Sequence, residues 1–331
     1  MPLHDASYQH WTGMHLGIWS RRSVIARQGL QACLENRWMR HLLVLCWGGA
    51  ALLAAGLFAL GQLLVADSLI VQWSANLDPV LQTFVRLLTQ WLEQHPEISV
   101  RTTQNILFYF GCRWLLPLSL AAIALAIPHL VTRDLSSNAI TIYAAKAVGR
   151  LDYALGKFMM IFGLLGLTWL GPLVAAWFLG NLLAPDWHFF WHSRLALFNT
   201  LAHVLPSMAI LSLLALGVSA VSAKEKTTVA IWVAWWIAGY ALAGIAEETK
   251  PWLRHFSLKH DLDALALARF RLQDDVELAQ QNIPVLGDML KDARAQLPAV
   301  LRDPPVAGSR LALSLMCGTS LLILRQKLKP E

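Results

Sequence analysis

The sequence predicts an all-α, polytopic membrane protein with about six transmembrane helices. Long apolar runs without charge recur along its 331 residues, and about 20 such residues are enough to cross a bilayer. Only 15% of the residues are charged, whereas a soluble domain usually carries about a quarter. The chain also has 15 tryptophans, several of them near the ends of the apolar runs. Tryptophan favours the membrane–water interface, which agrees with a protein embedded in lipid.

The rest of the composition excludes several classes of function. The net charge of +6 fits the basic residues that a multispan protein keeps in the cytoplasm, so no nucleic-acid partner is expected. The four cysteines show no CxxC spacing, which indicates packing rather than disulfides or a metal site. The first apolar run begins only at Leu42 and is too late and too long for a cleaved signal peptide.

The first elements are an N-terminal tail and the first span. Residues 1–41 are polar and basic, and an apolar stripe within them predicts an amphipathic elbow helix in the cytoplasmic interface. The alternative is a plain positive flank. Span one covers 42–66, and its glycines and alanines allow close helix packing. The polar connection 67–104 carries a second apolar stripe, which predicts an amphipathic helix outside the membrane or on its outer surface.

Five further spans are predicted, at 106–131, 158–184, 195–223, 227–246 and 309–325. The second contains Arg113, either a buried functional charge or, as we favour, a side chain that snorkels to the outer interface. The fourth contains His203, which we interpret as a packed side chain rather than a proton relay. The sixth is the weakest, because its uncharged part runs only from Leu311 to Leu324 and must borrow length from the preceding residues.

An insert of soluble character, residues 249–308, separates spans five and six. Its pattern predicts two helices, near 260–281 and 286–301. The insert is either a cap on the outer vestibule or a docking surface for an extracytoplasmic partner, and the sequence leaves both open.

The distribution of charge predicts the orientation. Lysine and arginine concentrate in the N-terminal tail, in 132–157, in the 224–226 turn and at the C-terminus. The shorter loops on the other side hold only Arg86, Arg101 and Arg194. The positive-inside rule then puts both termini in the cytoplasm. The expected location is a plasma membrane, such as the bacterial inner membrane.

Familiar catalytic motifs are missing from the sequence. It has no GxxxxGK[ST] phosphate loop, no HExxH and no GxSxG. His203 and Ser207 stand four residues apart on one span, which fits helix packing better than a catalytic pair. The spans hold almost no ionisable residue that could couple an ion gradient, so energy would have to come from a partner. We therefore expect a non-catalytic chain that binds no cofactor or metal itself.

The cytoplasmic stretch 133–158 is where a partner could act. An acidic residue follows span two, and charged and small residues continue in order to the start of span three: Asp134, Lys146, Arg150, Asp152, Tyr153, Gly156 and Lys157. This stretch resembles the cytoplasmic signature of type-2 ABC transporter permeases, the membrane-spanning subunits of ABC exporters. Ala147 stands where that family usually has proline, which affects the expected bend of the loop.

The resemblance implies a function and a set of partners. A second permease copy or a relative would complete the translocation path, and separate ABC ATPase subunits would bind the ATP. A helix over 136–147 would dock in a cleft of the ATPase. Lys146 and Arg150 would face acidic residues there, and Asp134 and Asp152 would face basic ones.

A smaller second contact would come from the turn formed by Lys224, Glu225 and Lys226. Two other functions stay open on the sequence alone. One is a secondary transporter or channel that works without ATP, and the other is a membrane scaffold or sensor that moves nothing. The transported substrate is not indicated.

Overall fold

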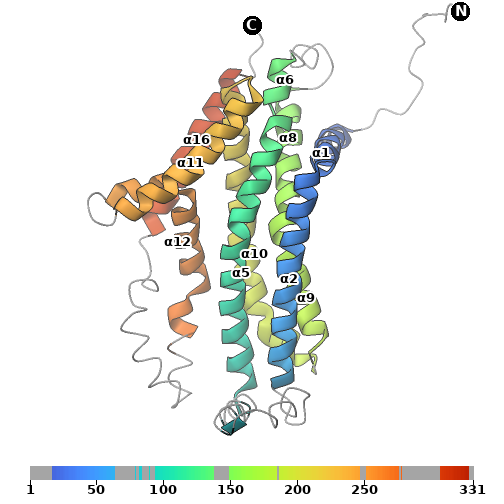
Figure 1. Cartoon of the computed structure of the whole chain (residues 1–331), viewed down its shortest axis with the longest axis vertical. Coiled ribbons are helices and arrows are strands. Elements are labelled where there is room, and N and C mark those ends of the chain that lie inside the picture. Colours follow the sequence, from blue (N-terminus) through green and yellow to red (C-terminus); the bar gives the residue numbers. More distant parts are fainter. Residues whose placement is uncertain are drawn as a thin grey trace, which may run out of the picture.

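The computed structural model of the chain is helical throughout the part that it describes. The described residues are 17–63, 79, 82, 83, 89, 94–137, 149–184, 186–246, 251–275, 277 and 306–327. No strand occurs among them. Helices run side by side along the long axis of the molecule, and α11 crosses them at an angle (Figure 1).

Six helical segments among the described residues are long and apolar enough to cross a membrane, which confirms the predicted multi-pass, all-α character. The helices that build them are α2 (Arg37–Leu63), α5 (Pro96–Ala126), α8 (Arg150–Leu165), α9 (Gly171–Leu182), α10 (His188–Val221), α11 (Glu225–Ala246) and α16 (Val306–Lys327). Both the cytoplasmic placement of the termini and the type of membrane stay predictions.

Most of these helices extend past the apolar runs that predicted them. Span two begins at Pro96 rather than at 106, so the end of the polar connection belongs to the helix. Span six runs over 22 residues from Val306 to Lys327, which supplies the length that its short apolar core lacks. Polar residues can continue a helix wherever the chain leaves the hydrocarbon region, because water then satisfies their side chains.

The third span is interrupted by a π-helical turn, η2 (Gly166–Leu170), between α8 and α9. Pro172 follows directly and has no N–H to donate to the carbonyl group four residues earlier. The wider π turn accommodates the lost hydrogen bond. In proteins, π-helix occurs mostly as such single turns within α-helices.

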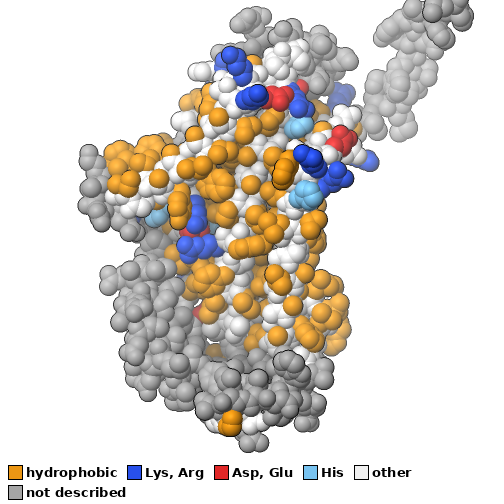
Figure 2. Space-filling model, viewed as in Figure 1, with side chains coloured by type: hydrophobic (Ala, Val, Ile, Leu, Met, Phe, Trp, Pro, Cys, Tyr) orange, Lys and Arg blue, Asp and Glu red, His pale blue; other side chains and the backbone are white. Residues whose placement is uncertain are grey.

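The centre of the bundle is formed by α5 and α10. In the most apolar window of each, 61% of the residues are buried, whereas the figure is 17% for α11 and α16. Two buried indole groups fix their neighbours to α5: Trp169 Nε1 donates to the Cys112 carbonyl at 3.2 Å and Trp232 Nε1 to the Leu120 carbonyl at 3.0 Å. The outer helices present a broad apolar surface, as the lipid requires (Figure 2).

The first part of the insert packs into the bundle. A 3₁₀ turn, η3 (Pro251–Phe256), leads into α12 (Leu258–Phe270), which is shorter than the helix predicted over 260–281. Asn105 Nδ2 on α5 donates to the Phe270 carbonyl at 2.7 Å. The helix predicted near 286–301 and most of the 67–104 connection lie outside the described residues.

Arg113 on α5 is tied to this inserted helix rather than only to the interface. Its Nε lies 3.4 Å from a carboxylate oxygen of Asp263 on α12, and its side chain is 39% exposed. Burial raises the pKa of Asp263, and the guanidinium group opposes that shift. The residue therefore joins the insert to span two, a role that neither interpretation from the sequence included.

His203 and Ser207 behave as the packing interpretation predicted. The Ser207 hydroxyl donates to the His203 carbonyl at 2.7 Å, which is a bond within the turn of α10. The His203 ring is buried and meets Trp169 and Phe270 edge to face.

Candidate functional site

The candidate site lies at the end of the bundle where α5 breaks. After α5 ends at Ala126, the chain passes through η1 (Ile127–His129) and a short helix, α6 (Thr132–Ser136). The start of α8 and the turn between α10 and α11 lie beside it. The described ends of the first loop predicted to meet a partner therefore lie beside the second such loop, the turn between α10 and α11. Basic side chains gather at this end, above the apolar surface (Figure 2).

Three of the predicted residues form one cluster that joins α6 to α8. The Tyr153 hydroxyl donates to Asp134 Oδ2 at 2.5 Å, and Lys157 Nζ lies 2.8 Å from the same oxygen. Lys157 Nζ also donates to the His129 carbonyl at 2.9 Å. The Asp134 and Lys157 side chains are only 14% and 11% exposed, so little water screens the pair. Within the described structure these two charges are satisfied by each other.

Asp152, a further predicted contact residue in the first turn of α8, is also engaged within the chain. Asp152 accepts from Arg22 on α1 (Ile18–Leu34), with Nη2 at 2.6 Å and Nε at 2.7 Å from Oδ1. This two-nitrogen contact fastens α1, the helix found where the elbow helix is expected, to the first turn of α8. Whether α1 lies in the membrane interface stays a prediction.

Gly156 allows α1 to approach α8 closely. A Cβ atom placed there would lie 2.8 Å from Ile25 Cβ and 3.3 Å from the Arg22 carbonyl oxygen, both on α1. Because Ile25 Cβ is fixed to the backbone, a side chain at 156 would have to push the two helices apart. The glycine of the Gly-Lys pair is thus required by packing, and the lysine beside it by charge.

Replacing Gly156 with alanine is expected to destabilise the protein by about 1–3 kcal/mol, because the added methyl overpacks the α1–α8 contact. Gly163→Ala, on the same helix, is the matched control. The nearest atom to its added Cβ would be 3.9 Å away, and alanine favours a helix over glycine by up to about 1 kcal/mol. Unfolding by SDS titration in mixed micelles measures both. Equal stability of the two variants would contradict the packing argument.

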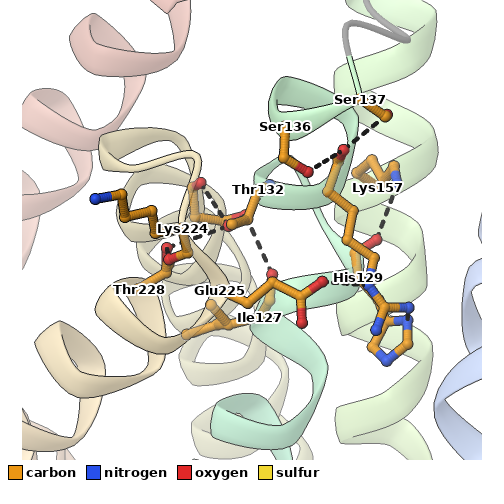
Figure 3. A network of polar contacts seen from close by, with 11 residues as sticks. Ile127, His129, Thr132, Ser136, Ser137, Lys157, Lys224, Glu225 and Thr228 are labelled. Atoms are coloured by element: carbon orange, nitrogen blue, oxygen red, sulfur yellow. Dashed lines mark hydrogen bonds and ion pairs between the residues drawn. The ribbon is translucent and has the colours of Figure 1, made fainter.

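A buried polar network connects the α5 break to the α10–α11 turn (Figure 3). Ser219 Oγ accepts from the backbone N–H of Val131 at 2.8 Å and of Thr132 at 3.1 Å, and donates to the Ile127 carbonyl at 3.2 Å. The Thr132 hydroxyl donates to the Ser219 carbonyl at 2.9 Å. Where α5 stops, its free backbone groups are thus satisfied by a neighbouring helix.

Thr228 extends this network into α11. Its hydroxyl lies 3.4 Å from the Thr132 hydroxyl and donates to the Lys224 carbonyl at 3.0 Å. On the surface, Arg133 Nε lies 2.7 Å from Glu225 Oε1, with both side chains about half exposed. Such an exposed pair contributes only about 0–1 kcal/mol, so the buried hydroxyl groups carry the connection.

The remaining predicted contact residues are exposed or undescribed. Arg150, Lys224 and Lys226 are exposed at this end, and the Lys224 side chain extends away from the network (Figure 3). Lys146 and the predicted docking helix beyond Ser137 lie outside the described residues. The exposed cations lie on either side of the buried network, so this surface is basic where a partner could touch it.

Sequence reasoning missed three residues that build this end: Arg22, Thr132 and Ser219. A serine and a threonine near the ends of apolar runs are common, and nothing in the sequence pairs residues 87 positions apart. Pro128 could have indicated this site. A proline after an apolar run predicts a break in the helix, and the backbone groups freed at the break need hydrogen-bond partners.

The described residues at this end provide hydrogen bonds and ion pairs that join α1, α6, α8 and α10, and three of the candidate side chains, Asp134, Tyr153 and Lys157, hold one another. No known protein family matches this chain, and no curated protein matches it. The function is therefore argued from the site and from the sequence motif alone.

Proposed function

We propose that this chain is the permease subunit of an ATP-driven transporter of the type-2 ABC class, an exporter whose ATPase subunits are separate proteins. The observation that carries the proposal is the hydrogen-bonded connection between α6 and the turn that joins α10 to α11. The helix α6, which precedes the predicted docking loop, and the 222–228 turn share the buried Thr132–Ser219–Thr228 network. A partner that moves the first loop would therefore also move the second.

The network would transmit a movement imposed by a partner at this end to the membrane-crossing helices. The helix α6 is attached to α8 by Asp134 and Lys157, and to α10 and α11 through Thr132. Four membrane-crossing helices would respond together as the ATPase closes on ATP. Transport then requires that the ATPase binds two arrangements of this bundle with different affinity. A second copy of the chain or a relative would supply the other half of the path.

The experiment that tests the proposal uses charge reversal on the predicted docking loop. The full chain should co-purify with a subunit that binds and hydrolyses ATP, and Lys146→Glu/Arg150→Glu should lower the recovered ATPase at least about ten-fold. That is the loss expected when two contacts of about 1 kcal/mol become repulsive. The matched control is Arg325→Glu, an exposed cation on α16 outside both loops.

Other outcomes would replace the proposal. Transport by the purified chain in vesicles under an ion gradient, with no nucleotide-hydrolysing subunit present, would identify a secondary transporter or channel. Equal ATPase recovery with both variants would remove the docking loop from the mechanism. Size-exclusion chromatography in detergent shows whether each variant is folded, so that a failed insertion is not mistaken for a lost contact.

A further inference from the structure

Three side chains that can bind a metal ion meet where η3 joins α12. Each of His255, His260 and Asp261 offers one ligand atom, and these three atoms lie within 4.8 Å of one another. The start of α12 produces this arrangement: Ser257 caps the helix by accepting from the His260 N–H at 3.3 Å. The cap fixes the first turn, which carries His260 and Asp261, against the 3₁₀ turn that carries His255.

The Asp261 carboxylate is buried, and one of its oxygens has no hydrogen bond of good geometry. The side chain is 0% exposed, and Oδ1 lies 2.7 Å from His255 Nδ1. Among the described residues Oδ2 has no hydrogen-bond partner, although the Ser309 hydroxyl lies near the carboxyl group. A buried acceptor without a well-formed hydrogen bond is unfavourable, and more so for a charged group, so this oxygen would be stabilised by a further ligand.

We propose that His255, His260 and Asp261 bind a divalent transition-metal ion, with Zn²⁺ as the best match. Two imidazole nitrogens and one carboxylate oxygen are the donor set of many three-ligand zinc sites, which leave a fourth position for water. At bond lengths near 2.1 Å the ligand atoms of a tetrahedral site lie about 3.4 Å apart. Side-chain rotations that move the ligand atoms by about an ångström would bring them to that separation.

The proposed ligands would neutralise only part of the charge of a bound ion. Two neutral imidazoles and one carboxylate would leave a bound divalent ion with a net charge of +1. Arg254 repels that charge at longer range, which weakens binding without removing any ligand.

The ion would link η3 to the first turn of α12, in a segment that also contacts α16 and α11. His255 abuts α16, because a Cβ at Gly308 would lie 2.7 Å from its Nε2. The Phe256 carbonyl accepts from Trp235 Nε1 on α11 at 3.2 Å. The opposite end of α16 packs near the inner network, with Ser320 against Gly217. Metal binding would thus stiffen the inserted segment where it packs against both of the last two spans, whatever the chain transports.

The test measures Zn²⁺ binding by the full chain, purified in detergent through a tag without histidine and stripped with EDTA. We expect one Zn²⁺ per chain, displacement of Co²⁺ from a site with tetrahedral visible absorption bands, and a rise in the thermal unfolding midpoint. His255→Ala, His260→Gln and Asp261→Asn should each weaken binding at least about ten-fold, the lower bound seen even for residues that only support a ligand.

The control variant is His188→Ala/His192→Ala, which removes a second histidine pair near Asp186 at the start of α10. It should bind Zn²⁺ as the unchanged protein does. Binding that survives all three ligand variants, or that falls only in the control, would overturn the proposal, as would an unchanged chain that takes up no ion. His260→Gln is the decisive variant if Asp261→Asn does not fold, because His260 is only partly buried.

Discussion

Replacing Ser219 with alanine is expected to destabilise the folded protein by about 2–4 kcal/mol, because two buried backbone donors lose their acceptor. Ser219 Oγ accepts from the N–H groups of Val131 and Thr132. Those two residues are 1% and 0% exposed, so bulk water cannot replace the hydroxyl. Unfolding by SDS titration in mixed micelles gives the free energy directly.

The size of the effect follows from the break in α5. Leu130 has ψ near −108°, outside the helical range, so the N–H groups that follow have no helical carbonyl to reach. The serine stands in for that missing carbonyl and returns a hydrogen bond to Ile127 at 3.2 Å. Alanine keeps the helix propensity of α10 and removes only the oxygen, which isolates the network as the cause.

Ser212→Ala is the matched control on the same helix. Its hydroxyl is buried like that of Ser219 but donates only to the Met208 carbonyl one turn earlier, at 2.7 Å. That carbonyl keeps its helical partner when the hydroxyl is lost, so the change in stability should stay within about 1 kcal/mol. If Ser219→Ala were no more destabilising than Ser212→Ala, the network would not hold the two loops together.

The number and type of the spans could be predicted because the bilayer sets them locally. A stretch such as α10 must be apolar over about 20 residues, and that requirement is visible without any knowledge of its neighbours. The ends of the helices were less well predicted. Pro96 begins α5 within a stretch of charged and polar residues, where hydrophobicity gives no signal and proline at the first turn does.

The contacts within the candidate site could not be predicted to the same extent. The motif suggested that Asp134 and Asp152 face outward toward a partner, whereas both pair with cations of this chain, Lys157 and Arg22. A sequence shows which residues are charged but not which of them fold back on one another. The role of the insert was similarly hidden, because Arg113 and Asp263 come together only through tertiary packing.

Lys157→Met is expected to destabilise the protein by about 2–3 kcal/mol, because it leaves the Asp134 carboxylate without its counter-ion in a site that excludes most water. Methionine preserves most of the aliphatic volume of the lysine, so lost packing contributes little. The His129 carbonyl loses its ammonium donor at the same time. The Tyr153 hydroxyl stays on Asp134 but carries no charge to balance it.

The double variant Asp134→Asn/Lys157→Met separates charge from structure. With both charges removed, much of the stability lost in Lys157→Met should be recovered. Neutralising a buried ion pair is far less unfavourable than leaving one of its charges without a counter-ion. Arg150→Met, an exposed cation at the first position of the same helix, should change stability by less than about 0.5 kcal/mol. The same SDS titration measures all three variants together with Lys157→Met.

The comparison also distinguishes two roles for the lysine. If Lys157 serves only a partner protein, as a contact residue would, the isolated chain should not change in stability when it is replaced, and Asp134→Asn should not compensate. If the lysine holds α6 to α8, stability falls in the isolated chain and the double variant restores it. The short distances within the cluster and its low exposure favour the second outcome. A partner would then act on this pair through the helices it joins, not by touching it.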